Sequence, residues 1–245
     1  MKKILVPALL ATVVGTFSSM AQAAEPESTL AFNAGVVSEY RYRGISQSRL
    51  NPALQGGVDY TDKSGFYVGT WASTIQWIKD ANGDAPVELD LYGGYKGAVG
   101  DLAYDVGFLR YEYSRNNLNP SANTNEVYGA VTYGLFTAKY SHATSNLFGF
   151  SGSKNSGYLD LSATVDLGDG YSLVPHLGHQ SVKGAGNSKY SYTDYALTLA
   201  KDLGNGLSAS AALIGTDAEK DSYVYSPTNK QLGKSTVVLG LKYTF

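Results

Sequence analysis

Short turn sequences recur along this chain at a spacing that fits one pair of β-strands per repeat. Their centres lie about 35 to 36 residues apart. Gly, Asn and Asp tolerate the positive φ angles that tight hairpin turns require. The repeat therefore predicts a series of hairpins whose turns lie at residues 62–65, 97–101, 133–135, 168–170 and 204–206.

Longer polar stretches lie between these turns, and we interpret them as loops at the opposite ends of the same strands. They cover residues 44–51, 78–86, 115–124, 146–156, 183–190 and 218–233. Six long loops and five short turns connect twelve strands. Outer-membrane barrels have even strand numbers, short periplasmic turns and longer extracellular loops. The pattern predicts an all-β fold: a transmembrane up-and-down antiparallel β-barrel of twelve strands over residues 24–245.

The segments between the breaks alternate apolar and polar residues with the two-residue period of a strand. A strand of about 10 residues crosses a membrane at a tilt of about 45°, so we expect the apolar face to meet lipid. The alternation is weak in residues 66–76, and Pro175 lies inside a predicted strand. Between Asp105 and Glu112 the polar face changes parity, which requires either a β-bulge or a strand end that rises above the bilayer. We expect local irregularity at these three places.

Residues 1–23 have the pattern of a cleaved secretory signal peptide. Lys2 and Lys3 precede an apolar run at residues 4–17, and residues 21–23 form an A-x-A cleavage site. The run is shorter than the roughly 20 residues of a spanning helix, so we favour cleavage over a retained anchor helix. Without Lys2 and Lys3, the 19 basic side chains become 17 against 21 acidic ones. This balance disfavours nucleic acid as a partner.

Tyr is abundant, with 20 residues, and only 16% of residues are charged, which is low for a soluble domain. The aromatic residues cluster near both predicted strand ends, as the girdles of a membrane barrel do. The girdle beside the turns comprises Tyr60, Phe66, Tyr95, Tyr104, Tyr133, Phe136, Tyr171 and Phe245. The girdle beside the loops comprises Tyr40, Tyr42, Trp77, Tyr111 and Tyr140.

A soluble, secreted β-sandwich would show the same alternation with its apolar face turned inward. The last strand argues against this alternative, because its alternating apolar residues end on Phe245. Such an ending resembles the signal read by the outer-membrane barrel assembly machinery. We predict that Leu241, Tyr243 and Phe245 form this assembly signal.

Charged side chains recur on the polar faces of the predicted strands. An Arg at the bilayer midplane costs roughly 2–4 kcal/mol, so these side chains are expected to point into the lumen. The predicted pore lining comprises Glu39, Arg41, Arg43, Asp59, Glu88, Asp90, Asp105, Glu126, Lys139, Asp160, Asp194 and Lys242, with Lys96 similarly placed. We expect the first three to form one row along the first strand. In the alternative, the charges pair with one another and fill a closed lumen.

The chain shows no catalytic pattern. His176 and His179 are three residues apart, so a strand places them on opposite faces and they cannot chelate one metal locally. His142, Ser145 and Asn146 invite comparison with a twelve-stranded phospholipase, but an odd spacing separates His142 from Ser145. The chain has no Cys, so a thiolate metal site is excluded. We predict no cofactor and no metal.

Residues 36–46, VVSEYRYRGIS, resemble the proteobacterial TorF-family porins, a family of formerly unknown function. The resemblance continues through residues 52–57, 65–71, 88–95, 104–107 and 126–129. It implies an outer-membrane barrel of porin type and offers no catalytic residue to transfer.

The sequence thus favours a passive channel for small solutes or ions in the cell outer membrane. A closed structural or adhesive barrel is the second reading, and a lipid-active enzyme is a distant third. The expected partners are outer-membrane lipid and lipopolysaccharide, the barrel assembly machinery during insertion, and the diffusing solutes.

Overall fold

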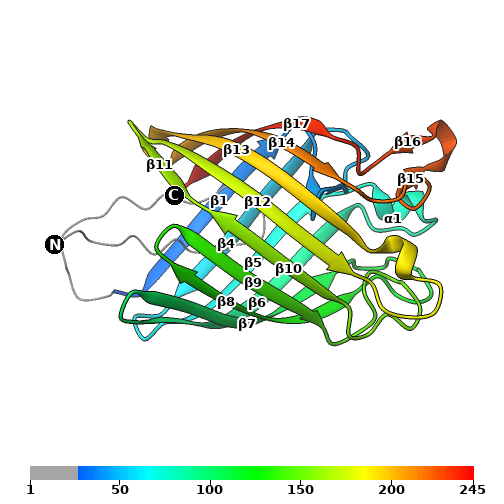
Figure 1. Cartoon of the computed structure of the whole chain (residues 1–245), viewed down its shortest axis with the longest axis horizontal. Helices are drawn as coiled ribbons and strands as arrows, with labels where there is room; N and C mark the ends of the chain where they lie inside the picture. Colours follow the sequence, from blue (N-terminus) through cyan, green and yellow to red (C-terminus); the bar gives the residue numbers. More distant parts are fainter. Residues whose placement is uncertain (1–26) are drawn as a thin grey trace.

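The computed structural model describes residues 27–245, which form one closed antiparallel barrel of twelve strands (Figure 1). The predicted signal peptide lies outside the described residues. The barrel strands are β1 Thr29–Val37, β4 Ala53–Thr61, β5 Phe66–Thr74, β6 Val87–Val99, β7 Leu102–Glu112, β8 Thr124–Tyr133, β9 Phe136–Ala143, β10 Gly157–Ala163 continued by β11 Val165–Gly168, β12 Tyr171–Ser181, β13 Tyr192–Gly204, β14 Leu207–Thr216 and β17 Thr236–Thr244.

The smaller elements all lie in the long loops. They are β2 Arg41–Tyr42, β3 Ile45–Ser46, α1 Trp77–Asp80, the 3₁₀ helix η1 Ser188–Tyr190, β15 Val224–Tyr225, the 3₁₀ helix η2 Ser226–Thr228 and β16 Lys230–Gln231. No helix in residues 27–245 is long and apolar enough to cross a membrane.

Each strand pairs with its neighbours along the chain, and the barrel closes where β17 pairs with β1. Val36 of β1 lies opposite Leu241 of β17. The ladder extends to the last residue, because the backbones of Phe32 and Phe245 exchange two hydrogen bonds of 2.8 and 2.9 Å. Their rings also stack, with centroids 5.8 Å apart. The C-terminal Phe therefore completes the seam of the barrel.

All five predicted turns are present, and they lie at one end of the barrel, beside the C-terminus (Figure 1). Two of them, Asp169-Gly170 and Asn205-Gly206, have positive φ at both central residues. This geometry defines the type I′ turn, whose twist matches that of the strands it joins. The six loops at the other end begin earlier than predicted and cover residues 38–52, 75–86, 113–123, 144–156, 182–191 and 217–235.

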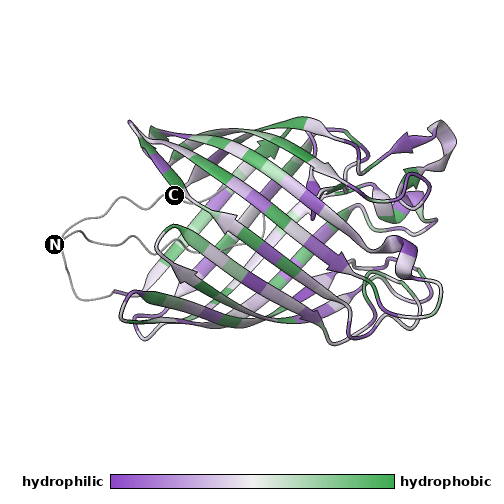
Figure 2. Cartoon of the chain, in the orientation of Figure 1, coloured by the Kyte–Doolittle hydropathy of each residue, from purple (hydrophilic) through white to green (hydrophobic). Residues whose placement is uncertain are grey.

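Apolar and polar residues alternate along the strands (Figure 2). The outer face carries exposed large apolar side chains, such as Leu54, Leu30 and Val237, which are 66%, 59% and 58% exposed. The inner face carries the polar partners, and Glu88, Glu126 and Asp194 are all buried there. The barrel is therefore apolar outside and polar inside, the reverse of a soluble protein.

The irregularities expected at three places are found in part. β5 and β7 pair continuously with both neighbours, so neither contains a bulge. Pro175 pairs opposite Leu197 of β13, but on its other side the ladder is interrupted, because pairing with β10 ends at Ser162 and pairing with β11 begins at Val165. The change of parity in β7 fits the second alternative, a strand end above the bilayer, because Arg110 and Glu112 lie on the outer face near its loop end and form an ion pair there. The register also shifts beside the type I′ turns, at residues 166–168 and 202–204.

The structure agrees with the predicted aromatic girdle at the turn end but not with most of the one predicted at the loop end. At the turn end, Phe66, Tyr133, Phe136 and Phe245 are more than 60% exposed, as expected of an outward-facing girdle. At the loop end, the prediction was wrong for the residues of loop 38–52 and its neighbours. Tyr40, Tyr42 and Tyr111 lie inside the lumen, because their hydroxyls find partners there. Trp77 lies in α1, whereas Tyr140 is 50% exposed on the outer face.

Single cysteines test the orientation of the barrel, since the natural chain has none. We expect Asn119→Cys and Lys154→Cys, in exposed loop positions, to react with an impermeant maleimide on intact cells. Asp169→Cys and Asn205→Cys should react only after the outer membrane is permeabilised. Equal labelling of all four variants on intact cells would contradict the predicted topology.

The seam at Phe245 predicts an assembly defect. Deletion of Phe245 removes two backbone hydrogen bonds and a ring stack at the point of closure, so the yield of folded protein in the outer membrane should fall. Val237→Ala, a change at an exposed position farther up the same strand, is the control. Heat-modifiable mobility on gels measures both, and an unchanged yield after the deletion would contradict the role of the terminal Phe.

Candidate functional site

Loop 38–52 folds inward and crosses the lumen. Tyr40 contacts β6 by donating a hydrogen bond of 2.6 Å to Glu88, and Tyr42 contacts β7 through a hydroxyl pair of 2.6 Å with Tyr111. The tip, Arg43-Gly44, has positive φ at both residues and joins β2 to β3. A Cβ at Gly44 would lie 2.8 Å from Cβ of Asp194 on β13, so only glycine fits there.

Arg43 reaches the far wall from this tip. Its Nη2 donates to both carboxylate oxygens of Glu126 on β8, at 2.8 and 3.0 Å, and its Nη1 donates to Gln180 on β12 at 2.6 Å. The guanidinium carbon lies 4.2 Å from the ring centroid of Tyr158 on β10. The Arg43 and Glu126 side chains are only 6% and 2% exposed. Arg43 therefore ties the loop to three strands across the barrel.

The predicted row of Glu39, Arg41 and Arg43 along the first strand is wrong. Strand β1 ends at Val37, so all three residues belong to the loop. Glu39 pairs with Arg41 at 2.9 Å, and Arg41 also donates to the carbonyls of Gly44 and Lys234. Two of the three charges are thus used within the loop region, and Arg43 alone reaches across the lumen.

Glu88 lies under the loop and accepts hydrogen bonds from two phenols. Tyr40 and Tyr113 donate to its two oxygens at 2.6 and 2.7 Å. Burial, reinforced by the charge of Glu88, holds the pKa of both phenols well above its usual range. Both hydroxyls therefore stay protonated and continue to donate. The rings of Tyr40 and Tyr113 join Trp71, Ile75 and Ile78 in an apolar cluster at the loop end of the lumen.

Tyrosines of the inner face also pair with carboxylates deeper in the barrel. Tyr92 donates to Asp59 and Tyr67 to Asp105, each at 2.6 Å. Each ring lies over a glycine of a neighbouring strand, and a Cβ there would collide with the ring. The pairs are Tyr92 with Gly69, Tyr67 with Gly94, Tyr128 with Gly107 and Tyr158 with Gly178. The rings therefore lie along the wall instead of projecting into the lumen.

A third polar group surrounds His176 on β12. Its two ring nitrogens lie 3.3 Å from Asp160 and 2.9 Å from Asp194, and the hydroxyl of Tyr158 donates to Asp194 at 2.9 Å. His179 faces the other way and contacts Thr193, as its odd spacing from His176 predicts. The phospholipase comparison gains no support, because the ring of His142 contacts Asn155 and not Ser145.

The strand-borne members of the predicted lining lie on the inner face, at alternate positions of their strands. Lys139 is 7% exposed and sits over the ring of Tyr128, whereas Lys96 lies directly opposite Asp105. Asp90 has a buried carboxylate oxygen, Oδ1, without a hydrogen-bond partner. Their role as a pore lining stays a prediction.

The opposite wall is lined by small side chains. Most inward positions of β13, β14, β17 and β1 hold small side chains, whereas Tyr192, Ile214 and Lys242 are larger exceptions. The small ones are Ala196, Thr198, Ala200, Ser208, Ser210, Ala212, Val238, Gly240, Asn33 and Gly35. Such side chains do not reach far from the backbone. Toward the loop end these side chains are nevertheless buried, because Ala196, Ala212 and Val238 pack together with Ile214 and Val37. Toward the turn end, Ser208, Ser210 and Gly240 are half-buried.

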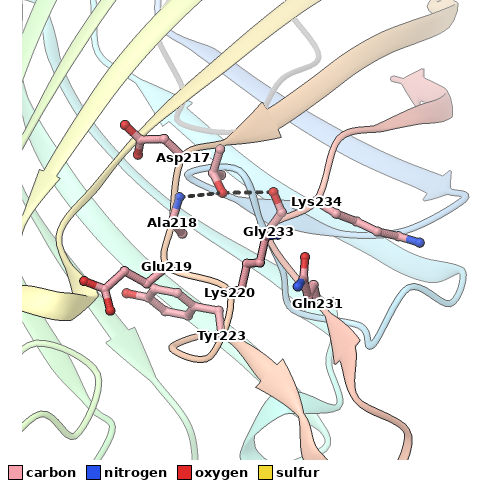
Figure 3. A pocket seen from close by; sticks show the side chains of 9 residues that line it. Asp217, Ala218, Glu219, Lys220, Tyr223, Gln231, Gly233 and Lys234 are labelled. Atoms are coloured by element: carbon pink, nitrogen blue, oxygen red, sulfur yellow. Dashed lines mark hydrogen bonds between the residues drawn. The ribbon is translucent and has the colours of Figure 1, made fainter.

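A separate pocket of about 360 Å³ lies in loop 217–235 (Figure 3). Its lining mixes two lysines, Lys220 and Lys234, with two acids, Asp217 and Glu219. Thr216 closes its base by donating to the carbonyl of Gly233 at 2.9 Å. The same loop accepts the hydrogen bond from Arg41 at Lys234, so it holds the inward loop in place.

A model of a family of bacterial proteins of unknown function, Gcw_chp, matches residues 21–245. The chain belongs to this family. No curated protein sequence matches it. The finer resemblance to TorF-family porins stays a prediction.

Solved porins share the fold of this Gcw_chp barrel. The NanC porin superposes with a TM-score of 0.55 at 12% identity, and the KdgM porin with a TM-score of 0.54 at 9% identity. Each comparison covers 89% of this chain and 99% of the porin. At such low identity the similarity concerns the fold alone.

The buried pair of Arg43 and Glu126 predicts a large loss of stability for Arg43→Ala in the Gcw_chp barrel. Breaking a buried pair leaves an uncompensated charge, which costs on the order of 3 kcal/mol. Arg110→Ala, which breaks a half-exposed pair with Glu112, should cost less than about 1 kcal/mol. Unfolding by guanidinium in detergent measures both. Adding Glu126→Gln to Arg43→Ala should restore part of the loss, and equal small losses in the two single variants would contradict the pair's role.

Proposed function

We propose that this chain is a porin-like channel for passive diffusion of small solutes or ions across the bacterial outer membrane. The exposed apolar outer face supports a location in lipid, because the same surface in water would aggregate. The closed barrel supports it further, since a barrel leaves no unpaired strand edge in hydrocarbon. The solved porins of similar fold agree with this location.

The observation that carries a channel over a closed barrel is the wall of small side chains on β13, β14, β17 and β1. Small barrels that are closed fill their lumen with large side chains. Here Ser208, Ser210 and Gly240, toward the turn end of this wall, are small and only half-buried. We infer that a narrow passage runs along this side, past the tip of loop 38–52.

One observation favours the closed, structural barrel as the second candidate. Loop 38–52 and its partners are packed tightly, with Tyr40, Tyr111 and Glu126 each 2% exposed. In the proposed channel this packing acts as a constriction, whose remaining opening limits solute size. In the closed barrel it acts as a plug. Conductance separates the two.

The remaining proposals concern the life of the chain in the cell. We propose cleavage of residues 1–23 on export, and recognition of Leu241, Tyr243 and Phe245 by the barrel assembly machinery. Contact with lipopolysaccharide would then involve the outer loops. The KdgM porin has been solved in complex with oligogalacturonate; the solute of this chain is not carried over from it.

Planar bilayer recording tests the channel. We expect the purified, folded chain to conduct, and Arg43→Ala to conduct more, because the side chain that spans the lumen is removed. Arg41→Ala should change the conductance less, since Arg41 is held by Glu39 and loop carbonyls. Leu161→Ala, at an exposed position of the outer face, is the control. Absence of current from the folded wild-type chain would favour the closed barrel.

A further inference from the structure

Carboxylates outnumber basic groups on the inner face of the described barrel. The strands contribute seven acidic side chains and three lysines, and loop 38–52 adds Arg43. Glu39 and Arg41 of the loop cancel each other as an ion pair. The acidic residues are Asp59, Glu88, Asp90, Asp105, Glu126, Asp160 and Asp194, and the lysines are Lys96, Lys139 and Lys242.

The excess negative charge lies on one wall. Glu126 is compensated by Arg43, and His176 lies between Asp160 and Asp194. In residues 27–245, neither Asp59 nor Asp90 makes an ion pair. The partner of Asp59 is the hydroxyl of Tyr92, and a neutral phenol orients a carboxylate without cancelling its charge.

The inner tyrosines supply a second, independent feature that favours cations. Lys139 Nζ lies 4.0 Å from the ring centroid of Tyr128, Arg43 lies 4.2 Å from that of Tyr158, and Lys96 lies 5.8 Å from that of Tyr67. The face of an aromatic ring is negative and attracts cations. Three basic side chains of the lumen thus lie on ring faces, whose negative charge offsets part of their positive charge.

We propose that the passage selects small cations, including protonated amines, over anions, and that Asp59 and Asp90 set this preference. The proposal rests on the proposed channel function. A charge in a narrow passage with low-dielectric walls acts on a passing ion more strongly than in bulk water. The buried Oδ1 of Asp90 has no hydrogen-bond donor, so a cation that passes beside it would supply the partner that keeps this carboxylate ionised. Lys242 on β17, two strands away from Asp59 on β4, opposes the effect but does not balance it.

Reversal potentials in a KCl gradient across a planar bilayer test the proposal on the full mature chain. The wild-type potential should have the sign of a cation-selective pore. Asp59→Asn and Asp90→Asn should each lower the ratio of K⁺ to Cl⁻ permeability, by about twofold or more in combination. Lys242→Gln should raise the ratio. Asp101→Asn, at an exposed turn outside the passage, should leave it unchanged.

The outcomes separate this proposal from the channel itself. A wild-type pore that prefers Cl⁻ would overturn the cation preference and leave the channel intact. A cation preference that survives both Asn substitutions in folded protein would overturn the role of Asp59 and Asp90. Folded wild-type protein that passes no current would overturn the channel, and the selectivity with it. Heat-modifiable mobility establishes the folding of each variant before recording.

Discussion

The pairing of β17 with β1 is the contact on which the rest of the barrel depends, because it removes the last two free strand edges. An unpaired backbone group in hydrocarbon costs several kcal/mol, so twelve strands that failed to close would be unstable in a membrane. The ladder runs to the chain end at Phe245. Closure also determines which alternate residues of every strand face inward. The charged side chains therefore share one interior.

That shared interior explains why loop 38–52 lies where it does. Near the loop ends of β6 and β8, Glu88 and Glu126 point into the lumen, where each carboxylate needs hydrogen-bond donors. The loop supplies them as Tyr40 and Arg43. These contacts also hold the loop in one position, because its short β2–β3 hairpin is too small to do so alone. The wall and the loop therefore form one polar core.

Most of the fold follows from local signals in the sequence, and most of the loop arrangement does not. Asn205-Gly206 marks its turn through backbone preference alone, so the five turns and the strand number could be predicted. The position of Arg43 depends on Glu126 and Gln180, which lie far away in the chain. Continued alternation after Val37 made residues 39–43 look like more of β1, although Gly44 with its positive φ signals a hairpin. Pro175 shows a partial success of local reasoning: its pairing with β13 is continuous, but the ladder on its other side is interrupted between β10 and β11.

The tyrosine rings that lie over glycines have a consequence for how such a passage changes over evolution. Tyr92 occupies the space above Gly69, and Tyr67 the space above Gly94. Any larger residue at either glycine would lift the ring off the wall and into the path of the solute. The width of the passage is therefore encoded partly at positions that no solute touches. A family of such barrels can acquire different size limits through changes at its glycines while every charged residue stays the same.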